Sequence, residues 1–234
     1  MGSTTSSAST LPPYKLPPPA TFGILIGIAP GGVKAYSSHY NTASKEDYPK
    51  WSSYKLYTDD GHYTGHKYQC VEFARRWLIE TNKMTFDDVW MAFQILKLKS
   101  FKSVVDKSDV DVERTENGKK GHLPVLGTVM LWNPRGFFFM TGHVAIVTHV
   151  RDGKIGIAEQ NVTHAAWGEG KNHARELDYS VDPETGAITI VDECFAPTYN
   201  AKVLGWVTPK AFLSRPAVAT SNPSASDPLV KSSL

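Results

Sequence analysis

The sequence contains little of what marks several large protein classes. Only 2 of the 234 residues are cysteine, which is too few for a disulfide framework. The 25 basic and 23 acidic residues leave a formal net charge of +2, so the charge balance does not favour a nucleic-acid partner. The longest apolar runs, such as Val144–Val147, are far shorter than the roughly 20 residues that cross a bilayer. We therefore expect neither a nucleic-acid partner nor a membrane partner.

Both ends of the chain are rich in serine and proline, a composition that cannot bury enough surface to fold. Residues 1–20 have neither the basic segment nor the roughly 7–15-residue apolar stretch of a secretory signal. We expect disordered tails at residues 1–21 and 214–234 and one folded domain over residues 22–213. The lack of a signal sequence predicts a cytoplasmic location.

Within residues 22–213, helix patterns come first and strand patterns follow. Apolar residues three and four positions apart predict helices over Cys70–Thr81 and Asp87–Leu98. Residues 101–123 carry charges of both signs and are expected to form a surface loop. This order is typical of an α+β fold in which N-terminal helices pack on an antiparallel sheet. The expected strands are Thr128–Trp132, His143–Val150, Lys154–Glu159, Ala187–Val191 and Val203–Val207.

Cys70 begins the first expected helix. The unpaired N–H groups and the positive end of the helix dipole there both stabilise a thiolate over a thiol. The alternative is a buried core cysteine, and we expect that role for Cys194, which lies near a strand end. His143 opens an apolar strand behind a glycine and is the candidate base for Cys70, although a satisfied histidine at the edge of a sheet would show the same pattern.

The hairpin after His143 supplies a third candidate. If residues 151–153 form a three-residue loop with glycine in the left-handed position, paired residues have numbers that sum to 304. That register places Asn161 opposite His143, with Glu159 two residues along on the same face. Either side chain could then fix the imidazole tautomer through Nδ1, and the pattern alone does not choose between them. A plain two-residue turn would put Glu159 on the opposite face.

Gln69 precedes the candidate nucleophile. Its side-chain amide could join the backbone N–H of Cys70 as an oxyanion hole. His62 and His66 stand four residues apart but have no third ligand nearby, so we expect no metal site. The chemistry of a cysteine and a histidine requires no metal or organic cofactor.

Several strings in the sequence are similar to one family. YQCVEFARRW, TGHVAIV and IAEQN, together with FGILIGIAPGGVKAYSS near the start and LGW near the end, resemble CHAP-type, papain-like cysteine amidohydrolases. The similarity is in particular to the amidase domain of the glutathionylspermidine and trypanothione synthetases, and it extends from Phe22 to about Val207. It implies that Cys70 is the nucleophile, His143 the base and Glu159 the acidic third member.

The resemblance also implies substrate contacts. Asn161 becomes a contact on the substrate side, and Arg75 corresponds to the family's glutathione-binding arginine. A backbone stretch that touches the substrate corresponds to Val89, Trp90, Met91 and Ala92. Trp90 stands where the family has a small residue, which puts the exact shape of the pocket, and hence the substrate, in question.

The activity implied by the resemblance is hydrolysis of glutathionylspermidine to glutathione and spermidine through a cysteine acyl-enzyme. The implied partner is therefore a small-molecule conjugate of glutathione and a polyamine, or a short peptide. Because no ATP-grasp synthetase domain precedes the end at Leu234, a standalone hydrolase is expected. Two alternatives stay open: a peptidoglycan endopeptidase or amidase, such as a D-alanyl-glycyl endopeptidase, and a non-catalytic protein that captures thiols or polyamines.

Overall fold

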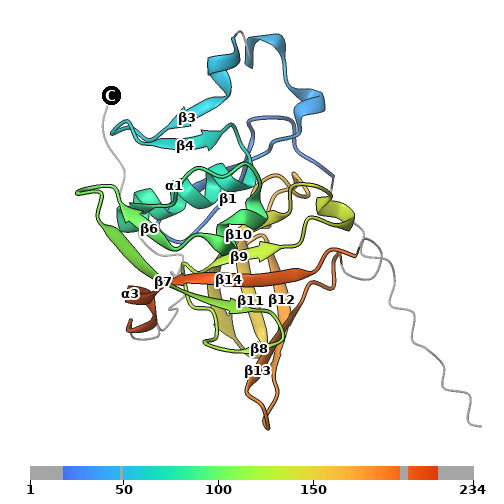
Figure 1. Ribbon diagram of the computed structural model, residues 1–234. Coiled ribbons are helices and arrows are strands. Elements are labelled where there is room, and N and C mark those ends of the chain that lie inside the picture. Colours follow the sequence, from blue (N-terminus) through green and yellow to red (C-terminus); the bar gives the residue numbers. More distant parts are fainter. Residues whose placement is uncertain (1–17, 48–49, 196–199, 216–234) are drawn as a thin grey trace, which may run out of the picture.

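A computed structural model describes residues 18–47, 50–195 and 200–215 (Figure 1). The expected tails, 1–21 and 214–234, lie almost entirely outside the described residues. The described part has one long helix, α1 (Cys70–Asn82), and a four-residue helix, α3 (Lys210–Leu213). Short 3-10 helices form at Tyr40–Thr42, Lys45–Asp47, Trp51–Tyr54, Ala92–Lys97 and Gly136–Phe138.

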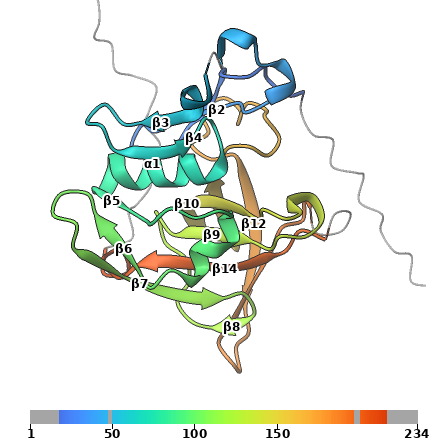
Figure 2. The ribbon, with the colours of Figure 1, turned by 45° about the horizontal axis from the view of Figure 1, so that its top comes forward.

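Ten strands form one antiparallel sheet in the order β5-β6-β7-β14-β9-β10-β11-β12-β13-β8. Their bounds, in that order, are Met84–Thr85, Ser100–Ser103, Asp109–Glu116, Val203–Pro209, Val129–Trp132, His143–Arg151, Lys154–Ala158, Arg175–Val181, Ala187–Val191 and Lys119–Lys120. Two small sheets pair β1 (Leu25–Ile28) with β2 (Lys34–Tyr36), and β3 (Lys55–Tyr57) with β4 (Tyr63–His66). Figures 1 and 2 both show α1 between the β3–β4 hairpin and the large sheet.

Strand β9 and residues 144–147 of β10 are continuously apolar because both faces of the sheet are buried there. Side chains alternate between the two faces of a strand. Leu131 and Ile146 lie in the core beneath α1 with Phe73, whereas Met130 and Val147 belong to a second core on the opposite face of the sheet. The strands that carry the site are therefore held by packing on both sides.

The first expected helix is confirmed, but the second is wrong. In the segment 87–98, only Ala92–Lys97 is helical, and it is a 3-10 helix. Asp87 and Asp88 are instead bonded to the guanidinium of Arg75, which holds this end of the segment out of a helix. The expected packing of several N-terminal helices on the sheet is therefore wrong, because α1 is the one long helix among the described residues.

The region 101–123 is not the expected surface loop, because it contains β7, β8 and most of β6. In β7, Val112 and Thr115 are buried while Asp109, Asp111 and Glu116 are exposed. The exposed face is so rich in charge that it conceals the alternation of a strand. Strand β12 was not expected at all.

The β10–β11 hairpin reaches the expected register by an unexpected route. Arg151 pairs with Lys154, so the turn has two residues, and both have positive φ. Paired numbers next to the turn therefore sum to 305. A bulge at Thr148 inserts one unpaired residue into β10, and beyond it Ile146 pairs with Ala158. The expected three-residue loop is wrong, but the expected sum of 304 is correct where the strands approach the site.

Candidate active site

Cys70 is the first residue of α1. Gln69 is the N-cap residue, with extended backbone (φ −74°, ψ 159°), and no described side chain caps the helix there. The first backbone bond of the helix runs from Phe73 N–H to Gln69 C=O at 3.1 Å. The N–H groups of the first turn therefore remain available to a substrate beside the sulfur.

A cleft of about 820 Å³ opens over Cys70. It brings together nine of the ten expected site residues: Gln69, Cys70, Arg75, Val89, Trp90, Met91, Ala92, His143 and Asn161. The tenth, Glu159, does not line the cleft, because it lies buried next to the imidazole of His143.

His143 and Glu159 form a buried pair. Nε2 of His143 lies 2.9 Å from Oε2 of Glu159. The expectation that the third residue bonds Nδ1 is therefore wrong, and Nδ1 is the ring nitrogen left for Cys70. Burial opposes the charged imidazolium, but the sulfur of Cys70 and the carboxylate of Glu159 outweigh it and raise the pKa of His143 to about 9.

Two aromatic rings enclose the imidazole of His143. Phe138 stacks on it with ring centroids 4.6 Å apart and planes 9° apart. Trp132, its partner in the β9–β10 ladder, lies at 5.3 Å with an interplanar angle of 57°. These contacts hold the plane of the imidazole and keep water from its bond to Glu159.

Glu159 has a second buried partner, which the sequence reasoning missed. Arg175 donates from Nε to Oε1 at 2.6 Å and from Nη2 to Oε2 at 3.2 Å. Burial raises the pKa of Glu159, but Arg175 and His143 outweigh burial and lower it to about 2. Arg175 also donates to Asp192 at 2.7 Å. Arg175 begins β12, a strand that the sequence did not predict, so no sequence signal indicated the pairing of Arg175 with Glu159. Asp192 follows an expected strand, and the sequence does show it as a polar residue at the end of that strand.

Gln69 is held by a chain of hydrogen bonds that sets the direction of its amide. Ser38 Oγ donates to Asn161 Oδ1 at 2.7 Å, and Asn161 Nδ2 donates to Gln69 Oε1 at 2.6 Å. Gln69 Nε2 donates to the hydroxyl of Tyr40 at 2.9 Å, and that hydroxyl donates to Lys67 C=O. Burial raises the pKa of Tyr40 to about 12, which keeps it a donor. Asn161 thus orients Gln69 as well as lining the cleft.

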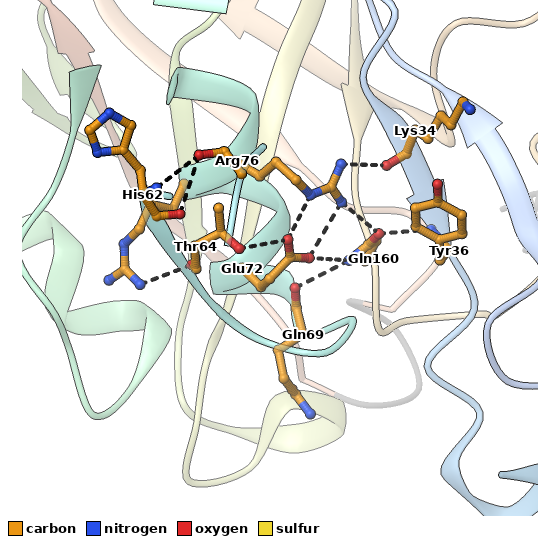
Figure 3. Close-up of polar contacts among 10 residues, drawn as sticks. Lys34, Tyr36, His62, Thr64, Gln69, Glu72, Arg76 and Gln160 are labelled. Carbon is orange, nitrogen blue, oxygen red and sulfur yellow. Dashed lines mark hydrogen bonds and ion pairs between the residues drawn. The ribbon is translucent and has the colours of Figure 1, made fainter. Parts of the chain in front are cut away.

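Glu72, two residues after the cysteine, is the centre of a buried network (Figure 3). Its carboxylate accepts hydrogen bonds from Arg76 Nε at 2.6 Å, Gln160 Nε2 at 3.0 Å and Thr64 Oγ1 at 3.2 Å. Gln160 Oε1 in turn accepts from Tyr36 N–H at 2.7 Å. The network ties α1 to β2, to β4 and to the segment after β11. The three consecutive residues 159–161 therefore hold the histidine, the helix and the N-cap amide.

Arg75 lies in the wall of the cleft with its guanidinium already partnered. It donates to Thr64 C=O at 2.9 Å and to Asp88 Oδ1 at 3.0 Å, and it packs on Phe86 at 4.8 Å. The Asp88 side chain is 74% exposed, so the ion pair reaches the surface. Trp90 follows it at the rim and is 92% exposed. Its indole is therefore free to meet a ligand.

Two further findings concern ligands and membranes. Among residues 18–47, 50–195 and 200–215, no group of three or more His, Cys, Asp or Glu side chains could hold a metal ion. His62 lies 3.8 Å from Asp60 instead. In the same part of the chain, every helix is too short or too polar to cross a membrane.

Comparison with known proteins finds relatives of this chain. A family model for the CHAP domain matches residues 60–161. Bifunctional glutathionylspermidine synthetase/amidase from Escherichia coli (strain K12) is 40% identical over 188 residues, which are 80% of this chain and 29% of that protein. Trypanothione synthetase from Crithidia fasciculata is 34% identical over 212 residues, 90% of this chain and 30% of that protein. The chain spans less than a third of the length of these curated relatives. The chain is therefore similar to the CHAP domain over residues 60–161 and, over most of its length, to parts of the glutathionylspermidine and trypanothione synthetases.

Proposed function

We propose that this protein is a thiol-dependent amidase that hydrolyses the amide between the glycine of glutathione and a polyamine, as in glutathionylspermidine. The observation that carries the proposal is the placement of Cys70 at a helix start in the cleft, beside the buried His143–Glu159 pair. The names of the relatives supply the substrate class. A nucleophile on a helix start and a base on a facing strand make the arrangement papain-like.

The first chemical step forms the acyl-enzyme. The thiolate of Cys70 attacks the glycine carbonyl carbon, and the backbone N–H of Cys70 and the amide of Gln69 stabilise the oxyanion that forms. The imidazolium of His143 gives its Nδ1 proton to the amine nitrogen as the C–N bond breaks. Glutathione is then held as a thioester, and the polyamine leaves.

The second step releases glutathione. His143 is now neutral and takes a proton from a water molecule, whose oxygen attacks the thioester carbon. The C–S bond breaks, glutathione leaves as the carboxylic acid, and the thiolate–imidazolium pair is restored. Glu159 stays ionised throughout and stabilises the imidazolium whenever His143 is protonated.

The substrate lies along the cleft. Arg75, held in place by the Thr64 carbonyl and Asp88, presents its guanidinium in the wall of the cleft to a glutathione carboxylate. Asn161 and the backbone of Val89–Ala92 flank the scissile amide, and the indole of Trp90 narrows the rim. We place the domain at residues 22–213, wider than the family match, because β1, β2 and β14 share the core beneath α1. A cytoplasmic location stays a prediction.

Hydrolysis of glutathionylspermidine tests the proposal. Wild type and the matched control Cys194→Ala should release glutathione and spermidine, identified by mass spectrometry, and Cys70→Ala should release neither. Release by Cys70→Ala would overturn the mechanism. If wild type releases neither product but frees amino termini from purified peptidoglycan, the substrate class is wrong and the cell-wall alternative is correct. If it cleaves neither substrate and iodoacetamide labels Cys70 no faster than Cys194 at neutral pH, the non-catalytic binding protein is the better interpretation.

A further inference from the structure

Five neighbouring strands each place one polar or aromatic side chain at the same end of the sheet. Trp132 ends β9, His143 begins β10, Glu159 follows β11, Arg175 begins β12 and Asp192 follows β13. Neighbouring strands are antiparallel, so the end of one strand and the start of the next lie at the same end of the sheet. All five residues are buried.

The five side chains form a closed ring of contacts. His143 bonds Glu159, Glu159 bonds Arg175, and Arg175 bonds Asp192. Oδ2 of Asp192 accepts from Trp132 Nε1 at 2.9 Å, and the indole of Trp132 packs back on the imidazole. His143 is thus held from one side by charge and from the other by packing.

Arg175 occupies both oxygens of the Glu159 carboxylate. It makes two charge-assisted bonds to Glu159, whereas His143 makes one. A planar guanidinium that bonds both oxygens fixes the plane of the carboxylate and therefore the direction of Oε2 toward Nε2. A buried carboxylate with a single partner would take up a proton more readily.

Asp192 compensates the positive charge of the buried Arg175. Its Oδ1 accepts from Arg175 at 2.7 Å and from the backbone N–H of Cys194 at 3.2 Å. The ring of Phe195 covers the guanidinium at 4.8 Å. Charges therefore alternate from His143 to Asp192, and the positive charge of Arg175 is shared between two carboxylates.

We infer that Arg175 and Asp192 are positioning residues of the active site: Arg175 keeps Glu159 ionised and aimed at His143, and Asp192 balances the charge of Arg175. This inference rests on the proposed roles of Cys70 and His143. Four titratable groups face the His143–Glu159 pair. They are Cys70 from α1, Arg175 from β12, and Asp192 and Cys194 from the segment after β13.

The test measures the rate of Cys70 alkylation by iodoacetamide against pH, by peptide mass spectrometry. This readout needs no substrate, so it can fail or succeed independently of the amidase assay. In Arg175→Met, Glu159 should take up a proton at a higher pH than in wild type. A protonated Glu159 no longer stabilises the imidazolium of His143, and the thiolate of Cys70 then loses the positive charge that stabilises it. The acidic midpoint of the alkylation rate should therefore rise by about 1–3 pH units. In Asp192→Asn, Arg175 still bonds Glu159, so the acidic midpoint should stay in place. The positive charge of Arg175 has then lost one of its two carboxylate partners and should disfavour the imidazolium, which lowers the alkaline midpoint.

Two variants keep the test decisive. Arg175→Lys retains the charge and should keep the acidic midpoint near that of wild type, even where Arg175→Met does not fold. Asp178→Asn removes a different ion pair between β11 and β12, at 2.5 Å from exposed Lys154, and should change neither midpoint. Wild-type midpoints in folded Arg175→Met, or a rise of the acidic midpoint in Asp192→Asn, would overturn the inference. So would a rise in Arg175→Lys as large as the one expected for Arg175→Met.

Discussion

Asn161 Nδ2 donates a 2.6 Å hydrogen bond to Gln69 Oε1, so a residue beyond β11 fixes the direction in which the Gln69 amide points. Asn161 has positive φ (61°), a conformation that asparagine adopts more easily than most residues. Its expected role as a substrate contact is therefore joined by a second one, the orientation of the amide beside Cys70.

Asn161→Asp tests that second role. The carboxylate would replace the donor with an acceptor opposite Gln69 Oε1, and the Gln69 amide should turn over to present its nitrogen to residue 161. The oxyanion would then lose one donor, so kcat should fall about 10²–10³-fold with little change in KM. Steady-state kinetics beside Gln69→Ala, which should cost about as much, check this. A raised KM at unchanged kcat would show that Asn161 only binds substrate.

The pH dependence follows from the raised pKa of His143. The folded value of about 9 exceeds the ordinary value of 6.5, so the protein favours the imidazolium. The associated stability is complete below about pH 6.5 and is lost as the pH rises through about 9. The imidazolium protonates the leaving amine, so kcat/KM should also fall above about pH 9. In Glu159→Gln the imidazolium loses a counter-charge, and this alkaline limb should move to lower pH. An alkaline limb near pH 6.5 in wild type would contradict the assignment.

Arg76 should matter for stability because it neutralises Glu72, whose side chain is fully buried. Arg76→Met leaves that carboxylate with neutral partners only and should lower the free energy of unfolding by about 3–5 kcal/mol. Lys210→Met is the matched control, since its ion pair with Asp111 is exposed and should contribute at most about 1 kcal/mol. Urea unfolding followed by circular dichroism measures both, and equal losses would show that the buried network is not needed.

Gly142 should be required directly before the histidine. A Cβ on Gly142 would lie 2.7 Å from the Trp132 carbonyl oxygen and 2.9 Å from Cβ of Phe93, and its φ is +64°. Gly142→Ala should therefore displace His143 and lower kcat at least about tenfold. Gly153→Ala has a similar φ of +74° but open space around it, so it should cost only the conformational strain of about 1–2 kcal/mol and leave kcat unchanged. Equal kcat values in the two variants would contradict this.

The positions of the proposed nucleophile and base could be predicted because each lies at the start of its own helix or strand. Cys70 stands at a helix start, and His143 opens an apolar strand. Glu159 was correctly expected on the same face of the sheet as His143, but through two errors that cancel. The turn is one residue shorter than expected, and an unexpected bulge at Thr148 restores the register. A bulge inside an apolar strand leaves no sequence signal.

The failures have a common physical cause, which is pairing between segments far apart in the chain. The expected helix over 87–98 is prevented at its start by Arg75, a side chain of another element. Arg175 and Asp192 join Glu159 only because β12 and β13 continue the same sheet. Local periodicity contains no information about such contacts, so the second helix was expected and the buried partners of Glu159 were not.

The acyl-enzyme on Cys70 can be trapped. Wild type is mixed with glutathionylspermidine, quenched in acid within one turnover, and analysed by peptide mass spectrometry. The peptide that contains Cys70 should gain the mass of glutathione minus water, the peptide that contains Cys194 should gain nothing, and Cys70→Ala should show no adduct. Products released at a normal rate with no adduct on Cys70, or an adduct on another residue, would show that Cys70 is not the nucleophile.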